Sequence, residues 1–218
     1  MTEDPQRLYS VKEVRDRASA MPDLAEALTW SQEYLTRPHP EMGRPGAVCP
    51  YVRGALDGGT LWFGQVRGTE STEEGVAAGI DRFREPFVGL WPQNRTSGVQ
   101  KALIVTFPDL AEEQACALLG GVARRVKLAF VEDGLLPGPA YPGNPTPSAH
   151  SNFPSMASPV PLVAIRLLFD TDLNFLNRPY DPPELRARLV SSFLRFVGPE
   201  LSTSRREAAE SALSSLTA

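Results

Sequence analysis

Residues 101–130, KALIVTFPDLAEEQACALLGGVARRVKLAF, decide the fold. The unbroken apolar run at 103–105 is typical of a strand that is buried on both faces of a sheet. Downstream, four apolar residues recur every four positions, which predicts one long helix: Leu118, Val122, Val126 and Phe130. Asp109, with Glu112 three residues later, is expected to cap this helix. The stretch therefore predicts a central strand covered by a helix.

Two further strands flank this unit, at 60–66 (TLWFGQV) and 162–169 (LVAIRLLF). Capping and proline signals predict about six helices, and those at the start form a helical segment over 10–35. Residues 133–160 are rich in proline and are predicted as one long loop, which is expected to form a lid or a wall of a site. Together these elements predict a single α+β domain over 1–218, with a small, mainly antiparallel sheet of three to five strands covered by helices.

The composition of the chain limits the classes of partner that we expect. The chain of 218 residues has a formal net charge of −4, which gives no overall positive field for nucleic acid. No apolar stretch approaches the roughly 20 residues of a membrane helix, and the first ten residues are polar and acidic, unlike a secretory signal. We therefore expect a cytoplasmic protein that binds neither nucleic acid nor membrane, and a homodimer is left open.

Common catalytic motifs are missing from the sequence. It has no phosphate-binding glycine loop, no H-E-x-x-H and no G-x-S-x-G. His39 and His150 are its two histidines, so a site made of three histidines is impossible. The candidate chemistry therefore rests on single residues in loops.

Cys49 is the more informative of the two cysteines. It lies in the proline-rich stretch RPHPEMGRPGAVCP at 37–50, and the nearby Arg53 would favour its thiolate form. The alternative is an inert, buried side chain, because free cysteines are commonly buried. Cys116 is predicted to lie in the core.

Both histidines are loop residues that admit two interpretations. Pro38 and Pro40 hold the backbone of His39 extended, so its ring is either presented rigidly to a ligand or exposed in a turn. His150 lies in the long loop, where it is either an acid or base for a ligand or a solvated residue.

Arg166 is unusual because it interrupts the apolar strand at 162–169. A buried charge without a partner costs several kcal/mol, on an order-of-magnitude scale. Either this face of the strand is open to a ligand, or a carboxylate such as Asp170 or Asp172 pairs with Arg166.

Three quoted segments resemble an uncharacterised actinobacterial domain family and, more distantly, the YqcI/YcgG family. They are HPEMGRPGAVCPYVRGALDGGTLWFGQV (39–66), KALIVTFPDL (101–110) and NFPSMASPVPLVAIRLLFDTDLNFLNRP (152–179). The wider family includes haem-containing enzymes of natural-product pathways that oxygenate nitrogen in guanidine-type substrates. In that family the last strand leads into a segment with a histidine, which this chain lacks. The resemblance thus implies either that haem is held by Cys49, His39 or His150, or that this chain binds no haem.

The resemblance implies a haem-dependent oxygenase or oxidoreductase of natural-product biosynthesis that acts on a small nitrogenous (guanidine- or amine-type) substrate. The haem site would contain Cys49, His39, Arg53 and Trp62, with Cys49 as the axial thiolate, and His150 and Arg166 would act in catalysis. The alternative is a non-catalytic domain that binds a small molecule or another protein.

Overall fold

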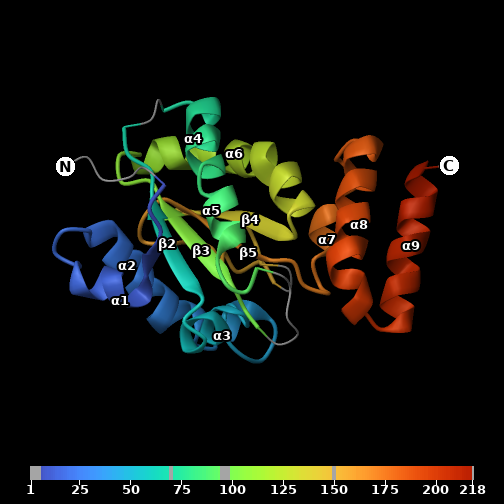
Figure 1. Ribbon diagram of the computed structural model, residues 1–218, viewed down its shortest axis with the longest axis horizontal. Coiled ribbons are helices and arrows are strands. Elements are labelled where there is room, and N and C mark those ends of the chain that lie inside the picture. Colours follow the sequence, from blue (N-terminus) through green and yellow to red (C-terminus); the bar gives the residue numbers. More distant parts are fainter. Residues whose placement is uncertain (1–5, 69–70, 94–98, 149–150, 218) are drawn as a thin grey trace.

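The computed structural model describes residues 6–68, 71–93, 99–148 and 151–217. A sheet of five strands forms the centre of the protein (Figure 1). Its strands are β1 (Tyr9–Ser10), β2 (Leu61–Gln65), β3 (Ala102–Thr106), β4 (Leu135–Ala140) and β5 (Leu162–Leu167), in the order β1-β2-β3-β5-β4. β2 and β3 are parallel, and the other three pairs are antiparallel. The predicted α+β fold with a mainly antiparallel sheet is confirmed.

Helices cover both faces of the sheet. One face carries α4 (Glu73–Asp81), α5 (Arg84–Gly89) and α6 (Glu112–Glu132). The other carries α1 (Val11–Asp16), α2 (Pro22–Trp30), the π-helical turn η1 (Ser31–Leu35), the 3₁₀ turn η2 (Pro40–Met42) and α3 (Val52–Asp57). We call these the α6 face and the α2 face.

The alternation of side chains along each strand separates the two cores. Leu61 and Phe63 of β2 pack in the core of the α2 face, whereas Trp62 packs against the core of the α6 face. The central strand β3 contributes to both cores, as its apolar run predicts: Leu103 and Val105 face α6, and Ile104 faces α2.

The start of α6 differs from the prediction. The N-cap residue is Ala111, whose backbone N–H donates to the side chain of Gln114, and not Asp109. Asp109 instead accepts a hydrogen bond of 2.9 Å from the backbone N–H of Gly68, in the loop that follows β2. The carboxylate thus joins the two loops that leave the parallel strands, and α6 begins three residues after it.

β4 occupies part of the segment 133–160 that the sequence predicts as loop, so the loop prediction is wrong for 135–140. Proline has no N–H, and Pro137 and Pro139 argue against a strand inside a sheet. β4 lies at the edge, however, and pairs only with β5, where Pro137 is opposite Ile165 and Pro139 is opposite Val163. An edge position leaves alternate N–H groups unpaired, which is why the prolines are tolerated.

The remaining helices lie together at one end of the molecule (Figure 1). They are α7 (Leu173–Leu176), α8 (Pro183–Val197), the 3₁₀ turn η3 (Gly198–Glu200) and α9 (Thr203–Thr217). They share a third core with Val131 of α6 and Leu168, which follows β5. None of the helices within the described ranges combines the length and the apolar character that crossing a membrane requires.

Candidate functional site

The candidate site is built around Arg166, near the end of β5. Alternation along β5 points Arg166 to the α2 face, like Leu162 and Ala164. Its guanidinium donates to both carboxylate oxygens of Asp172, at 2.6 and 2.7 Å. The Asp172 side chain is fully buried, whereas that of Arg166 is 22% exposed. Of the two carboxylates proposed from the sequence, Asp172 is therefore the partner, and Asp170 pairs with Arg205 instead.

Asp172 also organises the turn that follows β5. Its Oδ2 accepts a hydrogen bond of 2.7 Å from the backbone N–H of Phe169. Burial disfavours the charged guanidinium, but the hydrogen bonds to Asp172 and its negative charge outweigh this effect, so the pKa of Arg166 is raised. Arg166 therefore stays charged, in one orientation, at the edge of an apolar core.

Two aromatic rings flank the guanidinium. Tyr51, just before α3, and Phe169 stack with ring centroids 3.7 Å apart and an angle of 4° between their planes. The Arg166 Cζ lies 4.9 Å from the first centroid and 5.1 Å from the second. Nearly equal distances to two stacked rings place the cation beside the stack and not over one ring face. The Tyr51 hydroxyl is 3.2 Å from Thr171 Oγ1, which ties the two loops together.

Cys49 completes this group, which we call the Arg166 centre: Cys49, Tyr51, Arg166, Phe169 and Asp172. The thiol is half-buried, and its charge contributes to the raised pKa of Arg166. The arginine that faces Cys49 is thus Arg166, and Arg53, the neighbour proposed from the sequence, is exposed on α3.

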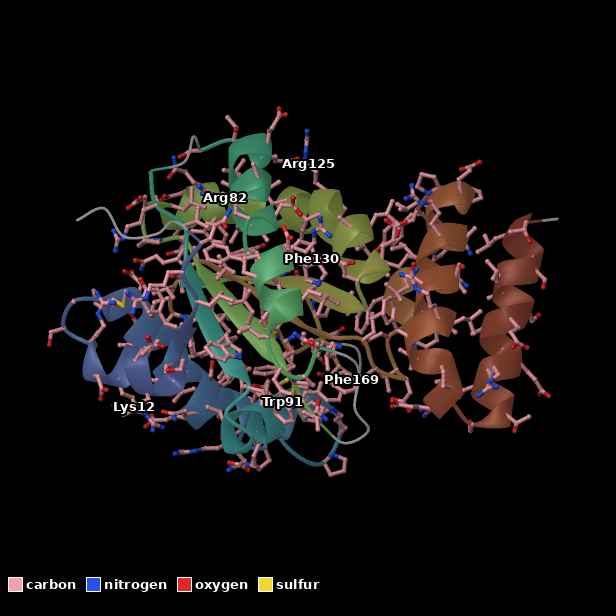
Figure 2. All side chains as sticks on the ribbon, viewed as in Figure 1. Lys12, Arg82, Trp91, Arg125, Phe130 and Phe169 are labelled. Carbon is pink, nitrogen blue, oxygen red and sulfur yellow. The ribbon has the colours of Figure 1, made fainter. Side chains whose placement is uncertain are left out.

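Figure 2 shows Phe169 at the end of the sheet near α3, away from Phe130 of α6. The centre combines residues from two loops that are more than a hundred positions apart in the sequence, 49–51 and 169–172.

His39 lies on the α2 face but contacts a different segment. Its Nδ1 accepts from the backbone N–H of Glu41 at 3.3 Å and caps η2. Its ring stacks on Phe153 with centroids 4.1 Å apart and an angle of 15°. Tyr34 donates from its hydroxyl to the carbonyl of Ser155 at 3.4 Å. The segment after β4 is therefore anchored against η1 and His39, and the predicted site residue His150 lies outside the described residues.

Trp62 is separated from the other proposed haem contacts by the sheet itself. It packs on the α6 face, whereas Cys49 packs on the α2 face. The four residues that the resemblance implies for haem, Cys49, His39, Arg53 and Trp62, thus do not line one pocket. Across the described ranges, no three His, Cys, Asp or Glu side chains come together in a group able to hold a metal ion.

Cys116 is exposed, so the prediction that it lies in the core is wrong. The buried positions of this part of α6 are Ala115, Leu119 and Val122. Cys116 follows Ala115 by about 100° around the helix axis and so falls off the buried stripe. Burial raises the pKa of Tyr141, and the neighbouring Cys116 adds to this effect.

Lys101 is a buried charged residue. The sequence predicts it only as the first residue of a strand and gives no sign of its burial. Its side chain is almost fully buried, and Nζ donates to three backbone carbonyls: Val88 at 3.3 Å, Leu90 at 2.7 Å and Pro92 at 3.1 Å. Because α5 ends at Gly89, the ammonium satisfies carbonyls at and just beyond the C-terminus of α5. Its role is structural.

These observations define an α+β protein with a mixed five-stranded sheet and a charged, partly exposed centre at one end of β5. The chain belongs to a domain family of unknown function (DUF6875), whose model matches residues 24–208. The match contains the whole Arg166 centre and confirms the expected membership of an uncharacterised family. No curated protein and no solved structure matches this chain. The family match provides no link to the YqcI/YcgG family, which stays a prediction.

Proposed function

We propose that this protein binds a small organic molecule at the Arg166 centre. The observation that carries the proposal is the Arg166 side chain, which is 22% exposed and is fixed by a fully buried carboxylate at the edge of an apolar core. A buried ion pair is weak evidence for stability, because apolar residues of similar volume often replace one without loss. A charged side chain that is not fully buried and lies beside a thiol and two rings is better suited to recognition.

The charge of the centre restricts how a ligand binds. Both Asp172 oxygens already accept hydrogen bonds from Arg166 and Phe169, so the carboxylate is not available to a ligand cation. A guanidinium or ammonium group would meet the positive charge of Arg166. A small nitrogenous substrate would therefore bind with a neutral or negative part toward Arg166.

The first prediction uses Cys49 as a reporter of binding. In a Cys116→Ser variant, which removes only the exposed thiol, Cys49 is the single site for alkylation by iodoacetamide. A ligand that occupies the centre should slow alkylation about tenfold at a concentration of about ten times its Kd. The rate is measured by intact-protein mass spectrometry in the presence of amines, guanidines and amino acids.

Unchanged alkylation of Cys49 with every compound would contradict the proposed function. If Cys49 does not react at all, saturation-transfer NMR with the same compounds decides the question, and the absence of transfer would be equally negative.

Haem-dependent oxidation is the second candidate function. It is supported by the resemblance, which implies that Cys49 would hold the iron, and cysteine sulfur is an established haem ligand. Haem would supply the oxidative chemistry. The described residues do not fit the group as first expected, because Trp62 lies across the sheet from Cys49. We therefore assign no reaction step to haem.

Haem binding has a direct spectroscopic test. If Cys49 holds the haem iron, protein produced with ample haem should show a strong Soret band, and its ferrous carbonyl complex should absorb to the red of a histidine-ligated form. Cys49→Ser should abolish that red-shifted band, and the matched variant Cys116→Ser should keep it. Colourless protein that ignores added haemin would exclude this candidate without affecting the binding proposal.

A further inference from the structure

Arg166 has five N–H groups, and the structure accounts for three of them. Nη1 donates to the carbonyl of Leu167 at 2.9 Å and to Asp172 Oδ2 at 2.6 Å. Nη2 donates to Asp172 Oδ1 at 2.7 Å. The Nε–H and the second Nη2–H have no hydrogen-bond partner among the residues that the structure describes.

These two N–H groups form a second pair of parallel donors, which we call a fork. In the planar guanidinium, the Nε–H and the Nη2–H beside it are parallel and spaced like the two oxygens of a carboxylate. Asp172 occupies the fork between Nη1 and Nη2. The fork between Nε and Nη2 therefore points in a different direction within the same plane.

The surroundings of Arg166 fix the orientation of this second fork. The stacked rings of Tyr51 and Phe169 lie beside the cation, and the carbonyl of Leu167 takes the remaining hydrogen of Nη1. With 22% of its side chain exposed, Arg166 remains accessible. The buried Asp172 prevents the guanidinium from turning toward solvent, so the second fork is held in a fixed orientation.

We propose that the free Nε–Nη2 fork of Arg166 binds an oxyanion group of the ligand, either a carboxylate or a phosphoryl group. This inference rests on the proposed function and names the part of the ligand that the centre recognises. It implies that a nitrogenous substrate of this protein carries an acidic group, as an amino acid does. The fork explains why arginine occupies this position: lysine would supply the charge but not two parallel donors.

The experiment observes the fork directly in the unmodified protein. The ¹⁵Nε–¹Hε signal of Arg166, assigned through its own backbone, is followed by NMR during titration with sodium acetate and, separately, inorganic phosphate. We expect a saturable shift of this signal. Sodium chloride at the same ionic strength should produce no such shift.

Arg84 is a matched control in the same spectrum, because its Nε–H already donates to Asp81 at 2.8 Å. Its signal should not move. A shift with acetate alone identifies a carboxylate ligand, and a shift with phosphate alone identifies a phosphoryl ligand. If neither anion shifts the Arg166 signal, or if Arg84 shifts equally, the proposal is wrong.

A second readout separates this proposal from the proposed function. L-arginine carries a carboxylate, and agmatine is the same molecule without it. In the Cys49 alkylation assay, arginine should protect at a concentration about tenfold lower than agmatine, since a charge-assisted bidentate pair is stronger than a neutral hydrogen bond. Equal protection by both would overturn the oxyanion fork but leave small-molecule binding intact, and protection by no compound would reject both.

Discussion

Replacing Asp172 by alanine is expected to lower the free energy of unfolding by about 3–5 kcal/mol, the cost of removing one partner of a buried ion pair. The substitution leaves the Arg166 charge uncompensated and removes the acceptor of the Phe169 N–H. Urea unfolding followed by circular dichroism at pH 7 measures the change.

Asp170→Ala is the matched control. Asp170 is two residues away, and its pair with Arg205 is exposed on both sides, so its removal should cost no more than about 1 kcal/mol. The double variant Arg166→Met with Asp172→Leu removes both charges and should recover most of the lost stability. Equal effects of the Asp172 and Asp170 variants would show that the pair is not buried as described.

Lys101→Met is expected to destabilise the protein by about 2–4 kcal/mol at pH 7, because buried carbonyls are left without a donor. Methionine keeps the length and the apolar stem of lysine but donates no hydrogen bond. The carbonyls of Val88, Leu90 and Pro92 lose their common partner. Urea unfolding of the two proteins measures the difference, and a loss below 1 kcal/mol would mean that water replaces the ammonium.

The lowered pKa of Lys101 also predicts that the free energy of unfolding depends on pH. Burial lowers the pKa of Lys101 from its ordinary value of 10.5 to about 8. Between pH 8 and 10.5 the unfolded chain therefore binds more protons than the folded one, and the contribution of Lys101 to stability increases with pH in this window. The difference in unfolding free energy between the wild type and Lys101→Met should grow from pH 8 to pH 10. A difference that stays constant would show that the three carbonyls hold the proton and that the pKa is not lowered.

The sequence predicts the middle of the sheet better than its edges. The apolar runs at 103–105 and 162–165 are long enough to be recognised as strands. The strands β3 and β5 lie at these predicted positions. β1 has only two residues, and β4 contains two prolines, so neither has a strand-like pattern. Edge strands satisfy fewer hydrogen bonds and tolerate such sequences.

The starts of helices are harder to predict from the sequence than the central strands. Ser10 and Glu13 form a capping box at the start of α1, as the sequence pattern S-x-x-E indicates. The chain between β2 and β3 forms two helices, α4 and α5, although Pro86 would be expected to end a helix: it lies inside the first turn of α5, where a missing N–H costs little. Asp109 shows that a carboxylate near a helix start can be used by another loop.

The sequence predicts only part of the candidate site. A lone arginine in an apolar strand requires a carboxylate or a ligand, and this argument found both Arg166 and Asp172. The contact of Tyr51 with Phe169 depends on tertiary structure and has no local signal. Strand alternation places Trp62 and Phe63 on opposite faces of the sheet, but only the tertiary structure shows that Cys49 shares the face of Phe63 and not that of Trp62.

The prolines of β4 also affect how the protein behaves at high concentration. In an antiparallel pair of strands, residue pairs that exchange two hydrogen bonds alternate with pairs that exchange none. Proline has no N–H to donate, so Pro137 and Pro139 belong to the pairs without hydrogen bonds, and their nitrogens face away from β5. The open edge of β4 thus has no donor at these two positions, and at the opposite edge β1 offers only two residues. Among the described residues, neither edge presents a long row of free N–H donors, which disfavours strand addition and edge-to-edge aggregation at both ends of the sheet.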